Sequence, residues 1–416
     1  MESGALGPMG LGLASLLVLC PAVFSAGEPG IIDVLYISRS LFQGGMTDRM
    51  LSYDPSISTQ AVPTAGGYSI SDLGLDPEMM NRVMRMYMPR SFDDLMNRTD
   101  LILLEEAPCG SNDFPQVIFD HRWISWFVRA VEDRGMPFSM WGGDASWGGG
   151  GEGSYRSWGD TTLDLILPFV CLSGYNPNTA GYQRPHFIDP EHPLARLPWK
   201  EAGPVELLNK VEVKQGATLV AEAVGGNVAY PWIAWWTSGQ GKVVGEAQVF
   251  GSSGTTDGML RDWRWYQDFL IYLVYFATDK PIPTDVYRVH RLREEISLHN
   301  DRTTLLMSLL EFIEKFGANT GKLYAELDDV SKREKEGEAF YREDDYDQAS
   351  RVLDDIQALW SRLEDRAVRA KDRALIWVYL TEWLSVTAAF LMTGCVLWSL
   401  MISRRLYRVV GSTRMA

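Results

Sequence analysis

The stretch from 375 to 402 is almost wholly apolar, and it constrains the architecture of this chain more than any other feature. At about 1.5 Å of rise per residue, a helix of this length crosses roughly 30 Å of hydrocarbon. Tyr379, Trp383 and Trp398 lie where aromatic side chains sit at membrane interfaces. We therefore expect one transmembrane helix at 375–402, with Glu382 at its outer interface, because a carboxylate at mid-membrane depth is costly.

A second apolar run, from Leu11 to Phe24, is followed by small residues that a signal peptidase accepts. This pattern predicts a signal peptide at 1–27. The segment before the run has no Lys or Arg, so an uncleaved signal anchor is the alternative. Export followed by one stop-transfer helix predicts a single-pass protein of the cell membrane. Its N-terminal domain would lie outside the cell and residues 403–416 in the cytoplasm. The arginines of that tail agree with this orientation, because basic residues are enriched on the cytoplasmic side of membrane helices.

The formal net charge of −15 argues against a nucleic-acid partner, because phosphate binding needs a basic stripe that the soluble part does not have. The bilayer is the partner that the apolar stretches predict. Cys109 and Cys171 are the only cysteines between the two apolar segments, and one disulfide between them is chemically allowed. Sequence separation says nothing about their proximity, and we expect them to remain unpaired.

Short β-rich runs alternate with helical segments from Ile31 onward. Strand, helix, strand order implies right-handed crossovers and a parallel sheet. We expect strands at 31–37, 101–104, 137–141, 165–170, 217–223 and 241–248, and helices at 121–133 and 260–277. Pro281 and Pro283 mark the end of this domain, so the sequence predicts an α/β domain at 28–283.

Beyond these prolines the composition changes to long charged helices. One apolar stripe consists of Leu292, Ile296, Leu306, Leu309, Ile313 and Phe316. Further on, apolar residues recur in steps of three and four, as in a coiled-coil seam: Leu353, Ile356, Trp360, Leu363, Ala367, Ala370 and Ala374. We expect a helical hairpin or stalk at 284–374 that packs on itself, on a second copy, or against another envelope protein.

A glycine-rich segment, 142–151, follows the strand expected at 137–141. Parallel α/β sheets turn sharply at such a point, where they display a nucleophile or bind a ligand. The segment contains no cysteine and lacks the lysine of a phosphate-binding loop. The residues expected to line a ligand-binding cleft are Trp141, Gly142, Gly143, Asp144, Ser146 and Trp147.

Four segments, in this order, carry a family resemblance: Gly-Gly-Asp-Ala-Ser-Trp-Gly at 142–148, the stretch at 161–169, the Pro-Glu-His-Pro-Leu turn at 190–194 with Leu197 and Pro198, and Gly-Gln-Gly-Lys-Val at 239–243. Together they resemble the class I glutamine amidotransferase-like superfamily, in its uncharacterised amidotransferase and trehalose-utilisation-type branches. The resemblance covers about residues 30–280 and implies a flavodoxin-like parallel sheet. Segments 377–384 and 403–408 look like tails of uncharacterised archaeal membrane proteins, which implies a prokaryotic cell surface.

The resemblance also implies chemistry that the sequence does not support. In such amidotransferases a cysteine at the elbow attacks the amide of glutamine, and a histidine oriented by a glutamate activates it. Residues 140–151 contain no cysteine, and residues 243–258 contain no histidine. We therefore expect the amidotransferase activity to be absent.

A substitute constellation would use Ser146 as nucleophile, His121, His186 or His192 as base, and Asp144, Asp189 or Glu191 to orient the base. His186 and His192 match no strong metal-ligand spacing, and we expect neither a metal nor a cofactor. The leading interpretation is a non-catalytic ectodomain that binds a ligand or partner at the cell surface. The alternatives are a surface hydrolase that acts on a saccharide or amide with a non-cysteine nucleophile, and a component that oligomerises or signals through its stalk.

Overall fold

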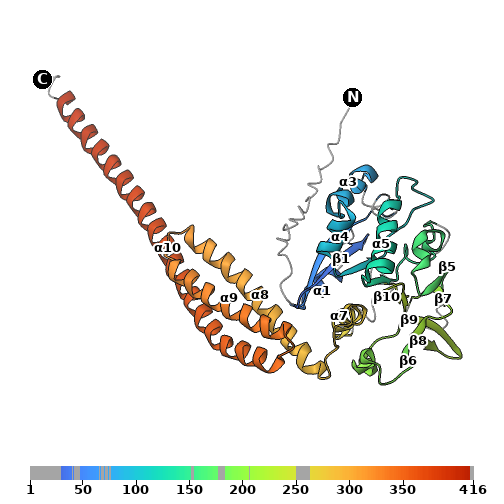
Figure 1. The fold of residues 1–416 in the computed structure, drawn as a ribbon. Coiled ribbons are helices and arrows are strands. Elements are labelled where there is room, and N and C mark those ends of the chain that lie inside the picture. Colours follow the sequence, from blue (N-terminus) through green and yellow to red (C-terminus); the bar gives the residue numbers. More distant parts are fainter. Residues whose placement is uncertain are drawn as a thin grey trace, which may run out of the picture.

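The computed structural model describes residues 30–39, 41, 47–64, 66, 70, 74, 76–150, 154–176, 183–205, 207–249 and 263–412. The expected signal peptide at 1–27 lies outside these residues. An α/β domain is followed by a bundle of helices, and one long helix projects from the bundle (Figure 1).

An eight-stranded sheet forms the centre of the α/β domain, in the order β2-β1-β3-β4-β10-β9-β8-β6. The first five strands in this order pair in parallel, and the last three continue the sheet in antiparallel pairs. The bounds are β1 Ile32–Ser38, β2 Ile57–Pro63, β3 Leu101–Glu105, β4 Phe138–Trp141, β6 Arg184–Phe187, β8 Thr218–Gly225, β9 Val228–Ser238 and β10 Gly241–Glu246. A separate antiparallel pair consists of β5 Phe169–Tyr175 and β7 Asn209–Val213. The α/β class and the mostly parallel sheet are as predicted.

The helices of this domain begin and end at residues that the sequence marks. α5, at His121–Arg134, begins after Asp120, whose side chain accepts a hydrogen bond from the N–H of Arg122. It ends at Gly135, which has the left-handed conformation (φ 72°) that glycine adopts most easily. The other helices are α1 Thr47–Leu51, α3 Pro77–Tyr87, α4 Phe92–Arg98 and α7 Tyr266–Ala277.

One expected strand is wrong. Residues 162–165 form a short 3-10 helix, η4, and the strand begins only at Phe169. The side chain of Thr161 accepts a hydrogen bond from the N–H of Leu163 and so starts the helical turn. Ile166 and Leu167 are buried in the core without belonging to any strand. Three further short 3-10 helices are η3 Trp158–Asp160, η5 Pro193–Arg196 and η6 Trp199–Glu201.

Three helices follow the α/β domain: α8 at Val286–Glu314, α9 at Gly321–Arg342, and α10 at Tyr346–Ser412. Their apolar faces form one core, separate from the core of the sheet domain. The seam from Leu353 to Ala374 lies in this core, with Trp360 fully buried. The seam therefore packs against α8 and α9 of the same chain, which is one of the arrangements expected for it. The seam residues are buried within the bundle's own core.

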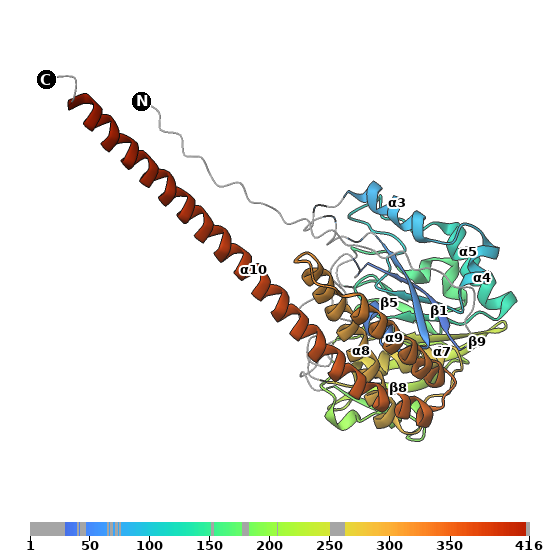
Figure 2. The same ribbon diagram turned by 90° about the vertical axis from the view of Figure 1, so that its left-hand side faces the viewer.

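α10 is continuous from the bundle to its end at Ser412 (Figure 2). Its burial ends at Ala374, which is 5% exposed, whereas Trp377 is 59% exposed. In the part of the chain that the structure describes, it is the one helix that is long and apolar enough to cross a membrane. The exposed apolar part coincides with the stretch predicted at 375–402.

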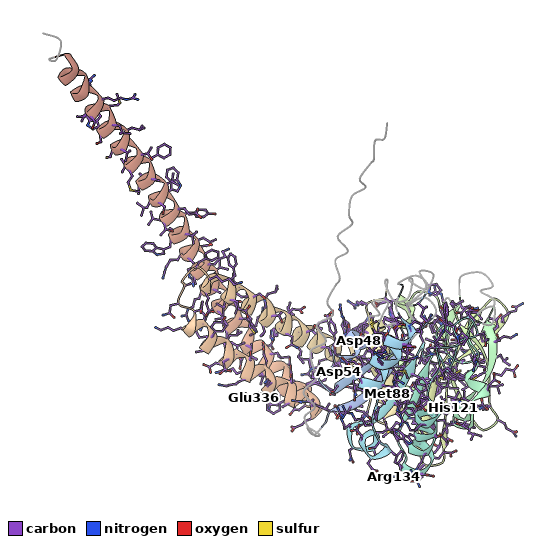
Figure 3. All side chains as sticks on the ribbon, turned by 90° about the horizontal axis from the view of Figure 1, so that it is seen from above. Asp48, Asp54, Met88, His121, Arg134 and Glu336 are labelled. Carbon is purple, nitrogen blue, oxygen red and sulfur yellow. The ribbon has the colours of Figure 1, made fainter. Side chains whose placement is uncertain are left out.

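A buried polar cluster joins the bundle to the α/β domain. Arg293 of α8 lies 2.8 Å from Asp54, which precedes β2, and 2.5 Å from Asp268 of α7. Figure 3 labels Asp54 at the side of the α/β domain that faces the bundle. The hydroxyls of Tyr275 and Tyr341 also donate to Asp54, at 2.8 and 2.9 Å. One cluster therefore holds residues from both parts of the molecule.

Candidate functional site

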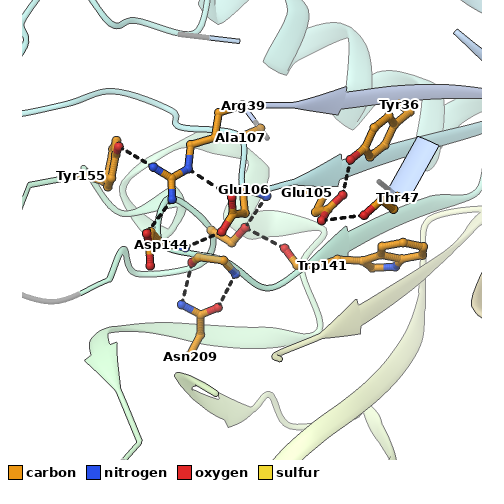
Figure 4. A network of polar contacts seen from close by, with 12 residues as sticks. Tyr36, Arg39, Thr47, Glu105, Glu106, Ala107, Trp141, Asp144, Tyr155 and Asn209 are labelled. Atoms are coloured by element: carbon orange, nitrogen blue, oxygen red, sulfur yellow. Dashed lines mark hydrogen bonds and ion pairs between the residues drawn. The ribbon is translucent and has the colours of Figure 1, made fainter. Parts of the chain in front are cut away.

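The carboxyl ends of β1, β3, β4 and β10 meet at one edge of the sheet. Ligands of open α/β sheets bind outside this edge, at the point where the strand order reverses, which here lies between β1 and β3. Polar side chains from all four strand ends lie there, and Figure 4 shows those that follow β1, β3 and β4. They are Arg39 after β1, Glu105 and Glu106 at the end of β3, Asp144 after β4, and Glu246 at the end of β10.

Arg39 is the centre of this network. Its Nη2 donates to Asp144 Oδ2 at 2.6 Å, and its Nη1 donates to the hydroxyl of Tyr155 at 2.9 Å. Its Nε lies 3.4 Å from Glu106 Oε2. Burial alone lowers the pKa of Arg39, but the neighbouring carboxylates and Tyr155 together raise it above its usual value. The guanidinium is thus a buried cation that is paired within the chain.

Glu106 has the backbone conformation that distinguishes this edge. It follows β3 with a φ of 49°, a left-handed value that is uncommon for a residue with a side chain. Its carboxylate is fully buried, and Oε1 accepts a hydrogen bond from the N–H of Asp144 at 3.4 Å. α/β folds display a catalytic side chain from a strained turn of this kind.

The sequence predicts the sharp turn near Gly142, one strand away. In the structure Gly142 does not have a positive φ, and the non-glycine residues that have one at this edge are Glu106, after β3, and Trp147, after β4 (φ 53°). The only signal in the sequence was a pair of glutamates directly after a buried apolar run. A glutamate at this position does not reveal its backbone conformation, so the turn was missed.

The glycine-rich segment after β4 is held firmly by its neighbours. The side-chain amide of Asn209 both accepts from the N–H of Gly143 and donates to its carbonyl, each at 2.9 Å. The hydroxyl of Ser146 donates to the carbonyl of Trp141 at 2.7 Å and accepts from the N–H of Glu106 at 3.1 Å. The hydroxyl of the candidate nucleophile therefore both donates to and accepts from backbone groups of the chain itself.

Five of the six residues expected to line a cleft are buried: Trp141, Gly142, Gly143, Ser146 and Trp147. The ring of Trp147 packs edge-on against Phe169, with ring centroids 5.0 Å apart. Asp144 alone reaches the surface, with its side chain 30% exposed, and it accepts a hydrogen bond from the hydroxyl of Tyr175. The tryptophans fill the core because the turn folds back onto the sheet.

The candidate histidines do not join Ser146. His186 lies on β6, which is four strands from β4 in the sheet, or about 19 Å at the usual strand spacing. It is exposed beside Glu222, at 3.9 Å. His192 begins η5, where its Nδ1 accepts a hydrogen bond from the N–H of Leu194. Burial lowers the pKa of His192, although Asp189 opposes this shift. The histidine at 121 is exposed at the start of α5.

No group of three or more His, Cys, Asp or Glu side chains within the described ranges is arranged to hold a metal ion. Cys109 and Cys171 are both free thiols. Burial raises the pKa of each to about 12, so both are protonated and unreactive at neutral pH.

Two buried carboxyl groups at the same edge were not predicted. Glu105 accepts hydrogen bonds from the hydroxyls of Tyr36 and Thr47, the second at 3.1 Å. Glu246 accepts from Trp232 Nε1 at 2.5 Å. Burial raises the pKa of Glu105 to about 8, and it raises the pKa of Glu246 well above its usual value. The side chain of Glu105 is therefore mainly uncharged at neutral pH.

No protein-family model and no curated protein matches this chain. Among solved structures, it is similar to two cytoplasmic proteins of Salmonella typhimurium. STM3548 is 18% identical, with a TM-score of 0.44 over 59% of this chain and 98% of that one. STM1381, from strain LT2, is 16% identical, with a TM-score of 0.43 over 59% of this chain and 99% of that one. The carbohydrate deacetylase Agd3 is 12% identical, with a TM-score of 0.35 over 60% of this chain and 32% of that one. These likenesses are too distant to carry a function to this chain.

The buried glutamates predict how stability depends on pH. A carboxyl whose pKa is raised by folding keeps a proton that the unfolded chain releases, so the free energy of unfolding falls as the pH rises. For Glu105 this fall extends from about pH 5 to about pH 8, at up to about 1.4 kcal/mol per pH unit. Urea unfolding of the detergent-solubilised protein across this range measures the slope.

Glu105→Gln should flatten this dependence, because the amide imitates the uncharged carboxyl. Glu336→Gln, at an exposed position of α9, is the matched control and should leave the slope as in the wild type. A wild-type stability that rises over this pH range would contradict the assignment.

Proposed function

We propose that this protein is a membrane-anchored, non-catalytic binding protein of a prokaryotic, archaeal cell surface. Its α/β domain would bind a ligand or partner protein outside the cell, and residues 403–416 would lie in the cytoplasm. The observation that carries the proposal is α10, which leaves the bundle at Ala374 and exposes apolar side chains from there to Ile402. The predicted signal peptide supports the orientation.

The strand order supports an amidotransferase-like, flavodoxin-like domain without the chemistry of that family. The order β2-β1-β3-β4-β10 agrees with the flavodoxin-like order. At the left-handed position after β3, where a nucleophile would be displayed, the chain has Glu106. Its carboxylate is buried against Arg39, so it does not face a substrate. The hydroxyl of Ser146 is likewise engaged, and no histidine bonds to it among the described contacts.

The same contacts indicate what kind of ligand the edge accepts. Arg39 lies at the point where the strand order reverses, but Glu106 and Asp144 already pair with it. An anionic ligand would have to displace these carboxylates. Asp144 is the partly exposed group, with Tyr155 and Tyr175 beside it. This arrangement favours an uncharged ligand with hydroxyl or amide groups, since phenol rings offer both stacking and hydrogen bonding.

Two arginines in the middle of the apolar stretch should release the protein from the membrane. Each charged side chain at the centre of a membrane helix costs about 2.5–3.5 kcal/mol on insertion scales. With Phe390→Arg and Leu391→Arg together, the full-length protein should shift from the carbonate-resistant pellet to the soluble fraction. Val368→Arg, at an exposed position of α10 within the bundle, should stay in the pellet. Extraction of the wild type by carbonate alone would refute the anchoring.

A surface hydrolase is the second candidate, because Glu106 has the strained conformation of a displayed catalytic residue. Purified full-length protein can be assayed for hydrolysis of glutamine and of chromogenic amides and glycosides. We expect no turnover above background. Activity that Glu106→Gln or Ser146→Ala abolishes, and that Glu336→Gln retains, would replace the binding proposal with the hydrolase.

A further inference from the structure

The connection between α8 and α9 carries an exposed pair of aromatic rings. Phe312 lies in the last turn of α8 and Phe316 directly after the helix, with ring centroids 4.9 Å apart. Their side chains are 43% and 38% exposed. The next turn back on the same stripe contributes Leu309, which is partly buried, and Leu305, which is exposed. The end of the bundle thus presents an apolar surface that its own core does not cover.

The register between helices places this connection along α10. Arg366 of α10 pairs with Glu326 of α9, and the two helices run in opposite directions. α9 begins at Gly321, about 8 Å from Glu326, and the same rise along α10 leads from Arg366 to about position 371. The connection therefore lies level with the last buried turn of α10, which ends at Ala374. Figures 1 and 2 both show the end of α8 beside α10 where α10 leaves the bundle.

We propose that the end of α8 and the α8–α9 connection, together residues 312–320, rest on the membrane surface and bury Phe312 and Phe316 among the lipid head groups. The inference rests on the proposed anchoring, because it requires α10 to enter the hydrocarbon directly after Ala374. Any group level with Ala374 then lies at the interface. There the removal of apolar surface from water contributes about 25 cal/mol per Å².

The charges near the connection nearly cancel, so they do not favour anionic over zwitterionic lipid. Glu311 and Glu314 are balanced by Lys315 and Lys322, and α10 adds Lys371, Asp372 and Arg373 at the same level. We therefore expect the contact to form on zwitterionic lipid, without a requirement for anionic head groups. Together with α10, it would give the bundle two attachments to the membrane. The α/β domain is joined to the bundle through Arg293, so these attachments would also fix its height and orientation.

A second copy of the chain could also bury this apolar stripe. It would bury a different set of side chains along α8 than the membrane would. The stripe continues along α8 from Phe316 through Leu305 to Leu298, which is exposed and about 27 Å from Phe316 along the helix. A partner helix would cover the whole stripe. A membrane at the level of Ala374 covers Phe316 and leaves Leu298 in water.

The test uses the full-length protein in phosphatidylcholine vesicles, with one environment-sensitive fluorophore attached to a cysteine. The label is placed by Phe316→Cys or, as matched control, by Leu298→Cys, in a background in which the native cysteines are replaced by alanine. A third sample keeps Cys395 alone, which lies in the apolar stretch and reports on anchoring. Lipids that carry a nitroxide close to the head group quench labels at the interface, and lipids that carry it on the acyl chain quench labels within the hydrocarbon.

Loss of most of the fluorescence at 316 with head-group nitroxide, with none lost at 298, supports the proposal. Quenching at 395 without quenching at 316 overturns it and leaves the anchoring intact. No quenching at either position refutes the anchoring as well. Blue-shifted emission at both 316 and 298 without lipid quenching shows that a second copy covers the stripe, and this also overturns the proposal.

Discussion

Replacement of Arg293 with methionine should lower the free energy of unfolding by about 3–5 kcal/mol. The guanidinium is buried, and it pairs with Asp54 at 2.8 Å and Asp268 at 2.5 Å. Burial lowers its pKa, but Tyr341 and Asp54 lead the groups that raise it well above the usual value, so the side chain is a cation. Removing it takes the guanidinium away from two buried carboxylates, and of its partners Asp268 keeps the imidazole of His290, at 2.6 Å. Urea unfolding of the full-length protein in detergent, followed by circular dichroism, measures the loss.

The effect should extend to the joint between the two parts of the molecule. Asp54 belongs to the α/β domain, Arg293 to α8, and Tyr341, which also donates to Asp54, to α9. The variant should therefore become sensitive to limited proteolysis between Ala277 and Val286, where the chain passes from α7 to α8. The wild type should resist cleavage there under the same conditions.

Two further variants separate the lost ion pairs from a general effect on α8. Arg291→Met changes an exposed arginine of the same helix, and it should cost less than about 1 kcal/mol. Arg293→Met combined with Asp54→Asn and Asp268→Asn removes the unpaired charges, so part of the stability should return. Equal losses for the two arginine variants, or no recovery in the triple variant, would contradict the role assigned to the cluster.

The elements that depend on local pattern were predictable. β1 and β3 are nearly continuous apolar runs because both faces of a parallel sheet are covered. The sequence marks the ends of α5 with Asp120 and Gly135, and the apolar repeat from Leu353 to Ala374 marked a buried helical seam. Each of these signals lies within one element, so neighbouring residues suffice to read it.

The site was not predictable in the same way, because its residues are brought together by tertiary structure. Arg39 and Asp144 are far apart in the sequence, and Asn209 reaches the turn of Gly143 from β7. The protonation of Glu105 depends on burial between elements, and the carboxylate of Glu106 has its partner Arg39 at the end of another strand. The glycines after β4 suggested an open turn, whereas they permit a close approach between backbones.

Gly142→Ala tests this reading of the glycines and should destabilise the protein by about 3 kcal/mol, at the upper end of the range for overpacked sites. A Cβ at this position would lie 2.2 Å from the carbonyl oxygen of Gln248 and 2.7 Å from the carbonyl carbon of Ala247. Both atoms are backbone, so no rotation of a side chain relieves the overlap. The N–H of Ala247 bonds to Trp232 at 2.9 Å, and its carbonyl accepts from Asn209 at 2.8 Å, which holds the strand end in place.

Gly337→Ala is the matched control, since its added Cβ would meet nothing closer than 3.4 Å, from Val352. In the interior of α9, alanine should stabilise the helix by up to about 1 kcal/mol relative to glycine. The two variants make the same chemical change, but Gly142→Ala should lower the stability of the protein and Gly337→Ala should raise it. Thermal unfolding in detergent distinguishes the two outcomes. If Gly142→Ala were as stable as the wild type, the ends of β4 and β10 would be able to move apart. The carboxyl edge would then be an adaptable surface, and the rigid placement of Asp144 and Arg39, on which the proposed ligand preference depends, would have to be abandoned.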